Sequence, residues 1–192
     1  MIITKIEPQK NPDRVNIYID GNFAFGLSKE IQIKYSLHED MEIDGVFIEN
    51  VLLEDEKLKA IDVSLNYLSY RNRSTKEIVD KLKKKGFEDH IIENTLDYLK
   101  HYNLIDDYQF SKSFMKDKIK LNKYGPERIK FELYRRGIPK EIVEEVIREY
   151  ENGYEYSLAY DLATKKIKSY KTDDKKVLYG KLGSFLQRRG FS

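Results

Sequence analysis

The sequence predicts a mainly α protein: a small N-terminal three-stranded sheet with short helices, followed by tandem three-helix repeats. Three observations predict this fold class. Apolar and polar residues alternate over much of residues 2–27, as in strands that are buried on one face. From Lys57 onward apolar residues recur at helical spacing between Gly, Pro and capping residues. This helical part also repeats itself at a separation of 51 residues, which is typical of repeat architectures.

An N-terminal β-hairpin is predicted for residues 14–27, where apolar residues occupy every second position on both sides of the centre. At the centre, Asp20-Gly21 can adopt the positive φ angles of a tight hairpin turn. Isoleucines within residues 2–6 should add a third strand that ends before the turn-forming Asn11-Pro12-Asp13. We therefore expect a three-stranded sheet.

Two short helices should follow the sheet. Ser28 can cap a helix that runs to about Tyr35, and Asp44 can cap another that runs toward Leu53. Both side chains accept hydrogen bonds from the first N–H groups of a helix, which have no partner inside the helix itself. The N-terminal domain then spans residues 1–56.

The internal repeat preserves the residue class at six positions in register, which is hard to obtain by chance. The six pairs are Ile78 and Ile129, Leu82 and Leu133, Gly86 and Gly137, Phe87 and Ile138, Ile91 and Ile142, and Ile92 and Val143. A third copy follows 53 residues after the second, with Leu182, Leu186, Gly190 and Phe191. We interpret each copy as one structural unit.

Each unit is expected to contain three helices, except the last. The helices are 57–71, 75–85 and 88–102 in the first unit, 107–122, 126–136 and 139–151 in the second, and 155–169 and 174–189 in the third. The units span residues 57–105, 106–153 and 154–192. Ser192 stands where the third helix of the last unit should begin. The apolar stripe of Leu178, Leu182, Phe185 and Leu186 is then covered by the first helix of that unit, by another molecule, or not at all, so we expect this unit to be the least stable.

The units also carry helix start and stop signals. Ser74-Thr75-Lys76-Glu77 has the sequence of a capping box, and Gly125-Pro126 stands 51 residues later with a permissible cap and a favoured first helical residue. Gly86, Gly137 and Gly190 each follow a predicted helix, where a glycine can adopt the left-handed conformation that ends it. Different residues therefore mark the same boundaries in successive units.

Composition limits the class of protein. The chain has 192 residues, 40% hydrophobic content, no cysteine, no long apolar run and no basic, apolar leader at Met1. We expect a folded cytoplasmic protein without disulfides or a membrane span. Residues 1–56 carry a net charge of −7 and the remainder carries +9. The basic part favours an anionic partner such as nucleic acid, although lysines that only solvate exposed helix faces would give the same composition.

The cations that could contact such a partner cluster before each turn and near the helix starts. The candidates are Arg71, Arg73, Lys83, Lys84, Lys85, Lys123, Arg128, Arg135, Arg136, Arg188 and Arg189. Cations in the last turn of a helix also interact favourably with the helix dipole, so a purely structural role remains open for them.

No residue pattern indicates a catalytic, cofactor or metal site. His38, His90 and His101 have no partner at a spacing suited to catalysis or metal binding. Asp106-Asp107 is explained by helix capping at Asp106 rather than by Mg²⁺ binding, and no glycine-rich phosphate loop occurs. We therefore assign no catalytic residue, cofactor or metal.

Two interpretations as a nucleic-acid-binding protein remain as alternatives. A helix–turn–helix DNA reader would fit the glycine turns, but the second helices begin Glu88-Asp89-His90 and Pro139-Lys140-Glu141, which suits capping and would repel phosphate. The 15 tyrosines could stack on bases of a single strand, although packing between helices is the commoner use of this residue.

Several ordered motifs resemble the RecX family over nearly the whole chain. They are residues 67–74 (YLSYRNRS) with Glu77, Leu82 and Gly86-Phe87; Leu104-Ile105-Asp106-Asp107 with Phe110; Lys123-Tyr124-Gly125-Pro126 with Ile129, Glu132-Leu133 and Gly137-Ile138; and Arg188-Arg189-Gly190-Phe191. The hairpin with residues 20–27 (DGNFAFGL) is similar to the N-terminal extension of Gram-positive members.

This resemblance implies regulation by binding. RecX proteins lie along the groove of a RecA recombinase filament on single-stranded DNA and hinder strand exchange and co-protease action. They are not enzymes, and the ATP belongs to RecA, so the resemblance implies no cofactor here. We expect a monomer that binds the filament, with single-stranded DNA as a further partner; the alternative is a general single-stranded nucleic-acid-binding repeat protein.

Overall fold

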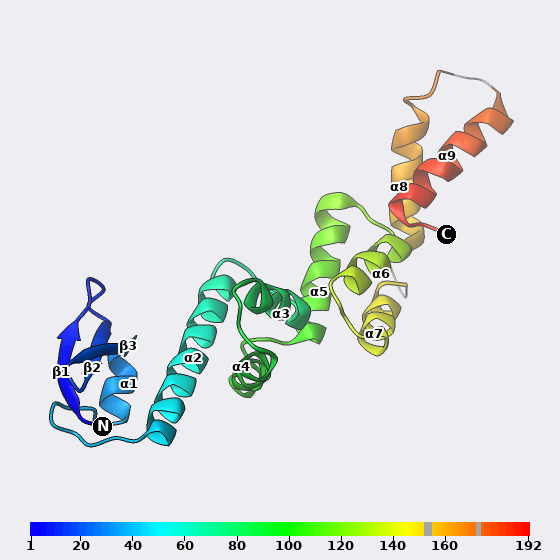
Figure 1. The fold of residues 1–192 in the computed structure, drawn as a ribbon. Coiled ribbons are helices and arrows are strands. Elements are labelled where there is room, and N and C mark those ends of the chain that lie inside the picture. The colour runs from blue at the N-terminus through cyan, green and yellow to red at the C-terminus, as the bar shows by residue number, and fades with distance from the viewer. Residues whose placement is uncertain (152–154, 172–173) are drawn as a thin grey trace.

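The computed structural model describes residues 1–151, 155–171 and 174–192. The chain is elongated, with the N-terminal sheet at one end and a pair of helices at the other (Figure 1). Between them the helices follow one another in chain order, so that each unit mainly contacts its neighbours in the sequence. This is the arrangement expected of a repeat array.

The N-terminal domain is the predicted three-stranded antiparallel sheet, in the order β1-β2-β3. Its elements are β1 (Ile3–Pro8), β2 (Arg14–Ile19), β3 (Asn22–Ser28) and the capped helix α1 (Lys29–Lys34). The hairpin turn is confirmed, since Asp20 has φ 47° and Gly21 has φ 80°. The buried core of this domain consists of Ile3, Val15, Ile17, Leu27, Ile31, Leu37, Ile43 and Val51.

One expectation was wrong: the helices predicted at 44–53 and 57–71 form a single helix, α2 (Gly45–Leu68), of 24 residues. Asp44 caps it as predicted. Glu54-Asp55-Glu56 contains no glycine or proline, and the Asp55 carboxylate binds the Ser28 N–H instead of capping a helix, so nothing interrupts the helix there. Position 57, where we placed the start of the first unit, therefore lies inside α2.

A buried carboxylate fastens α2 to the sheet domain. The Asp55 side chain is only 1% exposed and accepts a hydrogen bond from the Ser28 backbone N–H at 2.7 Å. Its other oxygen lies 2.6 Å from the Lys59 ammonium one turn further along α2, and 3.8 Å from the Arg14 guanidinium. These contacts compensate the charge that burial of an aspartate would otherwise leave unpaired.

The helices of the units lie close to their predicted positions. They are α3 (Thr75–Lys84) and α4 (Asp89–His101); α5 (Asp107–Asp117), the π-helix η1 (Lys118–Asn122), α6 (Pro126–Arg135) and α7 (Lys140–Glu151); and α8 (Glu155–Ile167) and α9 (Lys175–Arg189). The expected helix 107–122 thus changes to π geometry in its last five residues. It ends at Lys123 in the left-handed conformation, with φ 55°.

The repeat register is confirmed by burial. Ile78 and Leu82 in α3 and their counterparts Ile129 and Leu133 in α6 are all 0% exposed. The predicted stop signals are also confirmed, because Gly86, Gly137 and Gly190 have φ of 89°, 72° and 90°. Each unit is therefore built around the same helix followed by the same left-handed turn.

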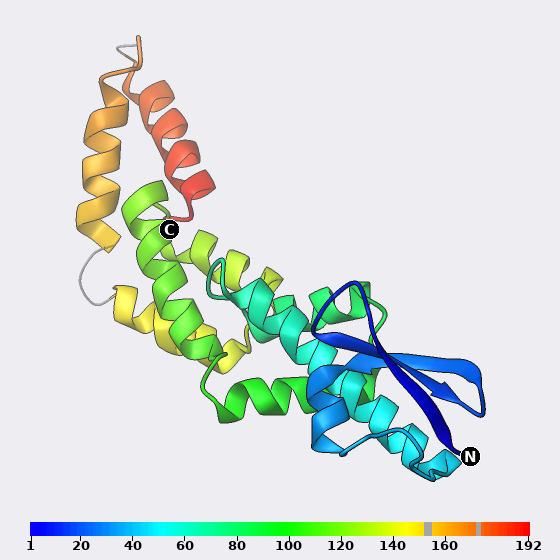
Figure 2. The same cartoon turned by 90° about the vertical axis from the view of Figure 1, so that its left-hand side faces the viewer.

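The third unit is packed less deeply than the other two. Its described residues form α8 and α9, which lie side by side in both overall views (Figure 2). Leu178, Leu182, Phe185 and Leu186 are only half-buried, and no residue within α9 is buried. The first helix of the unit thus supplies the cover that this apolar stripe needs, but an incomplete one.

The three equivalent leucines provide a test of this difference in packing. Leu82→Ala and Leu133→Ala should each destabilise the protein by about 2–5 kcal/mol, because each removes a fully buried side chain and leaves a cavity. Leu186→Ala at the equivalent half-buried position should cost less than about 2 kcal/mol. Urea denaturation followed by circular dichroism measures all three; equal losses of stability would contradict the observed ranking of the units.

Candidate partner interface

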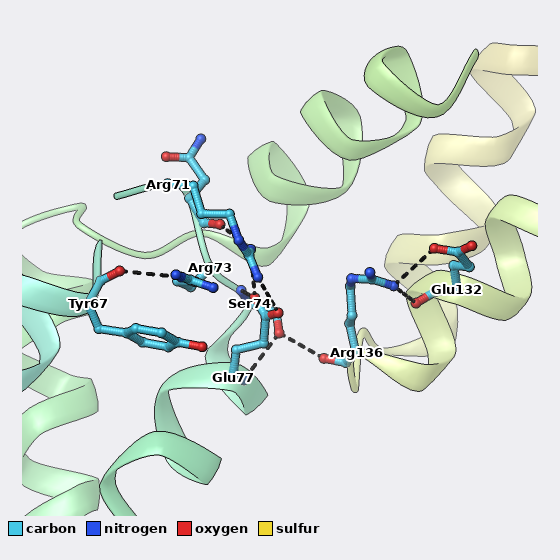
Figure 3. A network of polar contacts seen from close by, with 8 residues as sticks. Tyr67, Arg71, Arg73, Ser74, Glu77, Glu132 and Arg136 are labelled. Atoms are coloured by element: carbon cyan, nitrogen blue, oxygen red, sulfur yellow. Dashed lines mark hydrogen bonds and ion pairs between the residues drawn. The ribbon is translucent and has the colours of Figure 1, made fainter. Parts of the chain in front are cut away.

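The units are joined through the ends of their second helices. The buried Ser74, which caps α3, donates its hydroxyl to the Arg136 carbonyl at the end of α6, 2.8 Å away (Figure 3). The same hydroxyl accepts from the Glu77 backbone N–H at 3.3 Å, and the Glu77 carboxylate accepts from the Ser74 N–H at 3.2 Å. The predicted capping box is confirmed, and its serine also contacts the next unit.

The same joint recurs between the second and third units. The Gly125 N–H, which stands 51 residues after Ser74, donates to the Arg189 carbonyl at 2.8 Å. Arg189 stands 53 residues after Arg136. The Glu127 N–H then donates to the Gly190 carbonyl at 3.0 Å, and the Arg189 guanidinium donates to the Asn122 carbonyl. Equivalent carbonyls therefore accept from the start of the preceding unit's second helix at both junctions.

Both glycines at the second junction are required by contact as well as by conformation. A Cβ on Gly125 would lie 2.4 Å from the Gly190 carbonyl oxygen, and a Cβ on Gly190 would lie 2.3 Å from the Arg128 nitrogen. Sequence reasoning explained Gly125 as a cap and Gly190 by its positive φ, and it missed that the two meet. The available signal was that both glycines occupy repeat positions, Gly125 51 residues after Ser74 and Gly190 53 residues after Gly137. Only the tertiary structure shows that Gly125 and Gly190 are in contact.

This geometry separates the predicted cation clusters. Lys83-Lys84-Lys85, Arg135-Arg136 and Arg188-Arg189 each stand at the end of a second helix, and the last two lie at junctions. Successive clusters are thus about one helix length apart, which is roughly 15 Å for a helix of ten residues. The clusters do not merge into one patch; the array presents one cluster per unit.

Two of the predicted arginines stabilise the loop before α3 (Figure 3). The Arg71 guanidinium binds the Glu77 carboxylate through two hydrogen bonds of 2.8 and 3.1 Å. The Arg73 guanidinium lies over the Tyr67 ring, 3.7 Å from its centroid, and donates to the Tyr67 carbonyl at 3.3 Å. Both cations therefore have structural partners within the first unit.

Glu132 occupies the centre of a second group of cations, a role that the sequence did not predict for it. Its carboxylate lies 3.8 Å from Lys118, 3.5 Å from Arg128 and 3.4 Å from Arg136. The Arg136 guanidinium also lies over the Phe114 ring, 4.3 Å from its centroid. The four-residue spacing of Arg128, Glu132 and Arg136 was the available signal, because residues at this spacing share a helix face.

The remaining predicted cations are exposed. Lys83 forms a surface ion pair with Asp89 at 3.0 Å. Five others have no ion pair within residues 1–151, 155–171 and 174–192. These are Lys84, Lys85, Lys123, Arg135 and Arg188. They belong to all three units, and their charges are available to an anionic partner.

The described residues contain no cluster of three or more His, Asp or Glu side chains that could hold a metal ion. Over the same residues, no helix is both long and apolar enough to cross a membrane.

Comparison with known proteins identifies the family. Models of the regulatory protein RecX N-terminal domain and of the first, second and third three-helix domains of RecX match residues 1–44, 60–99, 106–147 and 153–192. The chain belongs to the RecX family. The matched segments follow the sheet domain and the three units in order, so the family's division of the chain agrees with the observed architecture.

Relatives and solved structures of the RecX family match over most of their length. The regulatory protein RecX of Finegoldia magna is 38% identical and is covered to 95%, with 100% of this chain aligned. That of Clostridioides difficile is 37% identical and covered to 90%, with 99% of this chain aligned. A crystal structure of regulatory protein RecX is similar with a TM-score of 0.81 and 31% sequence identity. The match covers 100% of this chain and 94% of that one. The crystal structure of RecX from Lactobacillus salivarius is similar with a TM-score of 0.69 and 29% sequence identity. That match covers 72% of this chain and 90% of that one.

Two glycine variants with the same unfavourable φ angle can test whether the second junction holds the third unit in place. Gly86→Ala and Gly190→Ala both place a side chain at a φ near 90°, which costs about 1–2 kcal/mol. The Cβ of Gly86 would meet nothing within 4 Å, whereas that of Gly190 would collide with Arg128. We expect Gly190→Ala alone to release α9, seen as faster amide exchange across residues 174–189. Equal exchange in the two variants would show that the junction does not hold the third unit.

The capping box predicts a pH effect on stability. Burial opposes ionisation of Glu77, but hydrogen bonds from Arg71 and Ser74 outweigh it and hold the pKa of this carboxyl below its ordinary value of 4.5. A group with a lowered folded pKa stabilises the protein above its unfolded pKa, and that contribution disappears as the pH falls through the folded value. The free energy of unfolding of the wild type should therefore decrease more steeply below about pH 4.5 than that of Glu77→Gln. Glu93→Gln, at an exposed position of α4, should leave the wild-type slope unchanged.

Proposed function

We propose that this protein binds the RecA filament assembled on single-stranded DNA and restrains strand exchange and co-protease activity. It would thereby act in homologous recombination, DNA repair and the SOS response in the cytoplasm, as a monomer and without catalysis of its own. Membership of a family whose proteins are named regulatory supports a role in control. The exposed cations of the three units fit an anionic partner such as a nucleoprotein filament.

The single observation that carries the proposal is the series of exposed cations along an elongated, jointed array. A filament repeats the same surface along its axis, so a protein with one cation cluster per unit can contact it at several points. Each exposed charge contact is weak, about 0.2–1 kcal/mol, but several held by one chain act together. The net charge of +9 on residues 57–192 favours association with a nucleoprotein in the same way.

A general single-stranded nucleic-acid binder is the second candidate, and the same net charge supports it. The two candidates differ in stoichiometry. A filament regulator should inhibit the DNA-dependent ATPase and strand exchange of RecA when added well below the RecA concentration. A competitor for DNA should inhibit only when enough protein is present to cover the strand. Inhibition that requires strand coverage, or no inhibition, would contradict the proposal.

Variants of exposed and engaged cations sharpen this test. Arg135→Ala combined with Arg188→Ala removes two exposed charges and should weaken filament binding about 2- to 30-fold, with helical content unchanged. Arg136 is unsuitable for this purpose, because it binds Glu132 and packs on Phe114. Binding is measured by co-sedimentation with RecA filaments over a series of salt concentrations. An affinity equal to that of the wild type at every salt concentration would remove Arg135 and Arg188 from the interface.

A further inference from the structure

The first unit contains a groove between the end of α2 and the outer face of α3. It has a volume of about 230 Å³ and is lined by Val63, Asn66, Tyr67, Tyr70, Lys81 and Lys85. Two aromatic rings and two ammonium groups thus border one small space. None of these side chains belongs to the junctions between units.

Tyr70 is the unusual member of this group. It is 84% exposed, and its ring makes no aromatic or cation contact within the described part of the chain. Tyr67 beside it is half-buried and is held by Arg73 at 3.7 Å and Lys81 at 5.2 Å from the ring centroid. The Tyr67 ring is therefore part of the protein's own packing, whereas the Tyr70 ring is largely open to solvent.

The internal repeat provides a comparison for the charges of this groove. In the second unit, Glu132 stands 51 residues after Lys81, and Arg136 stands 51 residues after Lys85. There the Glu132 carboxylate forms ion pairs with Arg136 at 3.4 Å and with two further cations. In the third unit the equivalent cation, Arg189, donates to the Asn122 carbonyl.

The first unit therefore differs from both of its copies. It has a lysine where the second unit has the ion-pairing glutamate, and neither Lys81 nor Lys85 has an ion pair within residues 1–151, 155–171 and 174–192. The aromatic side differs as well, since Leu121 of the second unit stands where the first has Tyr70. At these repeat positions, the described residues thus combine an exposed ring with two unpaired lysines in the first unit alone.

We propose that this groove binds single-stranded nucleic acid, with one base stacked on Tyr70 and the adjoining phosphates bound by Lys81 and Lys85. Aromatic side chains beside cations bind single strands because every base has a face to stack and every linkage carries a charge. A duplex hides its base faces, and an acidic peptide would use the lysines without the ring. The inference rests on the proposed function only for the presence of a single strand near the protein.

Fluorescence anisotropy with labelled 15-mers of deoxythymidine and of uridine, without RecA, tests the stacking contact. Tyr70→Ser should weaken binding about 5- to 100-fold, whereas Tyr70→Phe keeps the ring and should stay within about twofold of the wild type. Tyr156→Ser is the matched control, because Tyr156 on α8 is 83% exposed. Comparison of the two oligomers shows whether DNA or RNA is preferred at the same groove.

The charge contacts are tested by giving the first unit the residue of the second. Lys81→Glu should weaken binding and reduce the slope of log K against log salt by about 0.7 for each phosphate that the groove no longer binds. Lys10→Glu has the same change in net charge at an exposed site of the sheet domain and should retain the wild-type salt slope. Circular dichroism verifies that each variant is folded.

Three results would overturn the proposal: wild-type affinity in Tyr70→Ser, equal binding of a 15-base-pair duplex, or equal competition by polyglutamate at the same charge concentration. Because the oligonucleotide assay contains no RecA, such a result rejects the groove and leaves the filament hypothesis standing. Conversely, oligonucleotide binding without substoichiometric inhibition of RecA would reject the proposed function and leave the groove in place.

Discussion

The array depends on one repeated interaction, in which the carbonyl before a left-handed glycine turn accepts a hydrogen bond from the start of the preceding unit's second helix. Ser74 with Arg136 and Gly125 with Arg189 are its two instances. Backbone groups at helix ends lack partners within the helix, so each junction satisfies groups of two units at once. The side chains at the junction can therefore change from serine to glycine while the joint itself is kept.

This constraint also explains how the cations are divided between structure and surface. A basic residue at the end of a second helix stabilises the helix dipole and stands beside the joint, as Arg136 and Arg189 do. Its neighbour in sequence, Arg135 or Arg188, is exposed to solvent. Pairs of adjacent arginines thus combine one residue that supports the array with one that is left for a partner.

Much of the fold could be predicted from the sequence because its determinants are local: the Asp20-Gly21 turn, the helix caps and the glycine stops act within a few residues of themselves. The continuity of α2 was not predicted, because a change of charge near residue 56 marks a change of composition and does not end a helix. The candidate site could be predicted only in part. The sequence identified the cations, but their partners lie far along the chain, since Ser74 meets Arg136 across 62 positions. The role of Glu132 required the same tertiary information.

Because α2 is continuous, it couples any movement of the sheet domain to the first unit. At 1.5 Å per residue a helix of this length extends roughly 36 Å without a loop that could absorb rotation. It is clamped to the sheet domain through Asp55, and its far end leads directly into the loop held by Arg71 and Arg73. If a bound partner rotates the sheet domain, Tyr70 and α3 should therefore tilt with it, since they follow the far end of the same rigid helix, about four helical turns beyond Asp55.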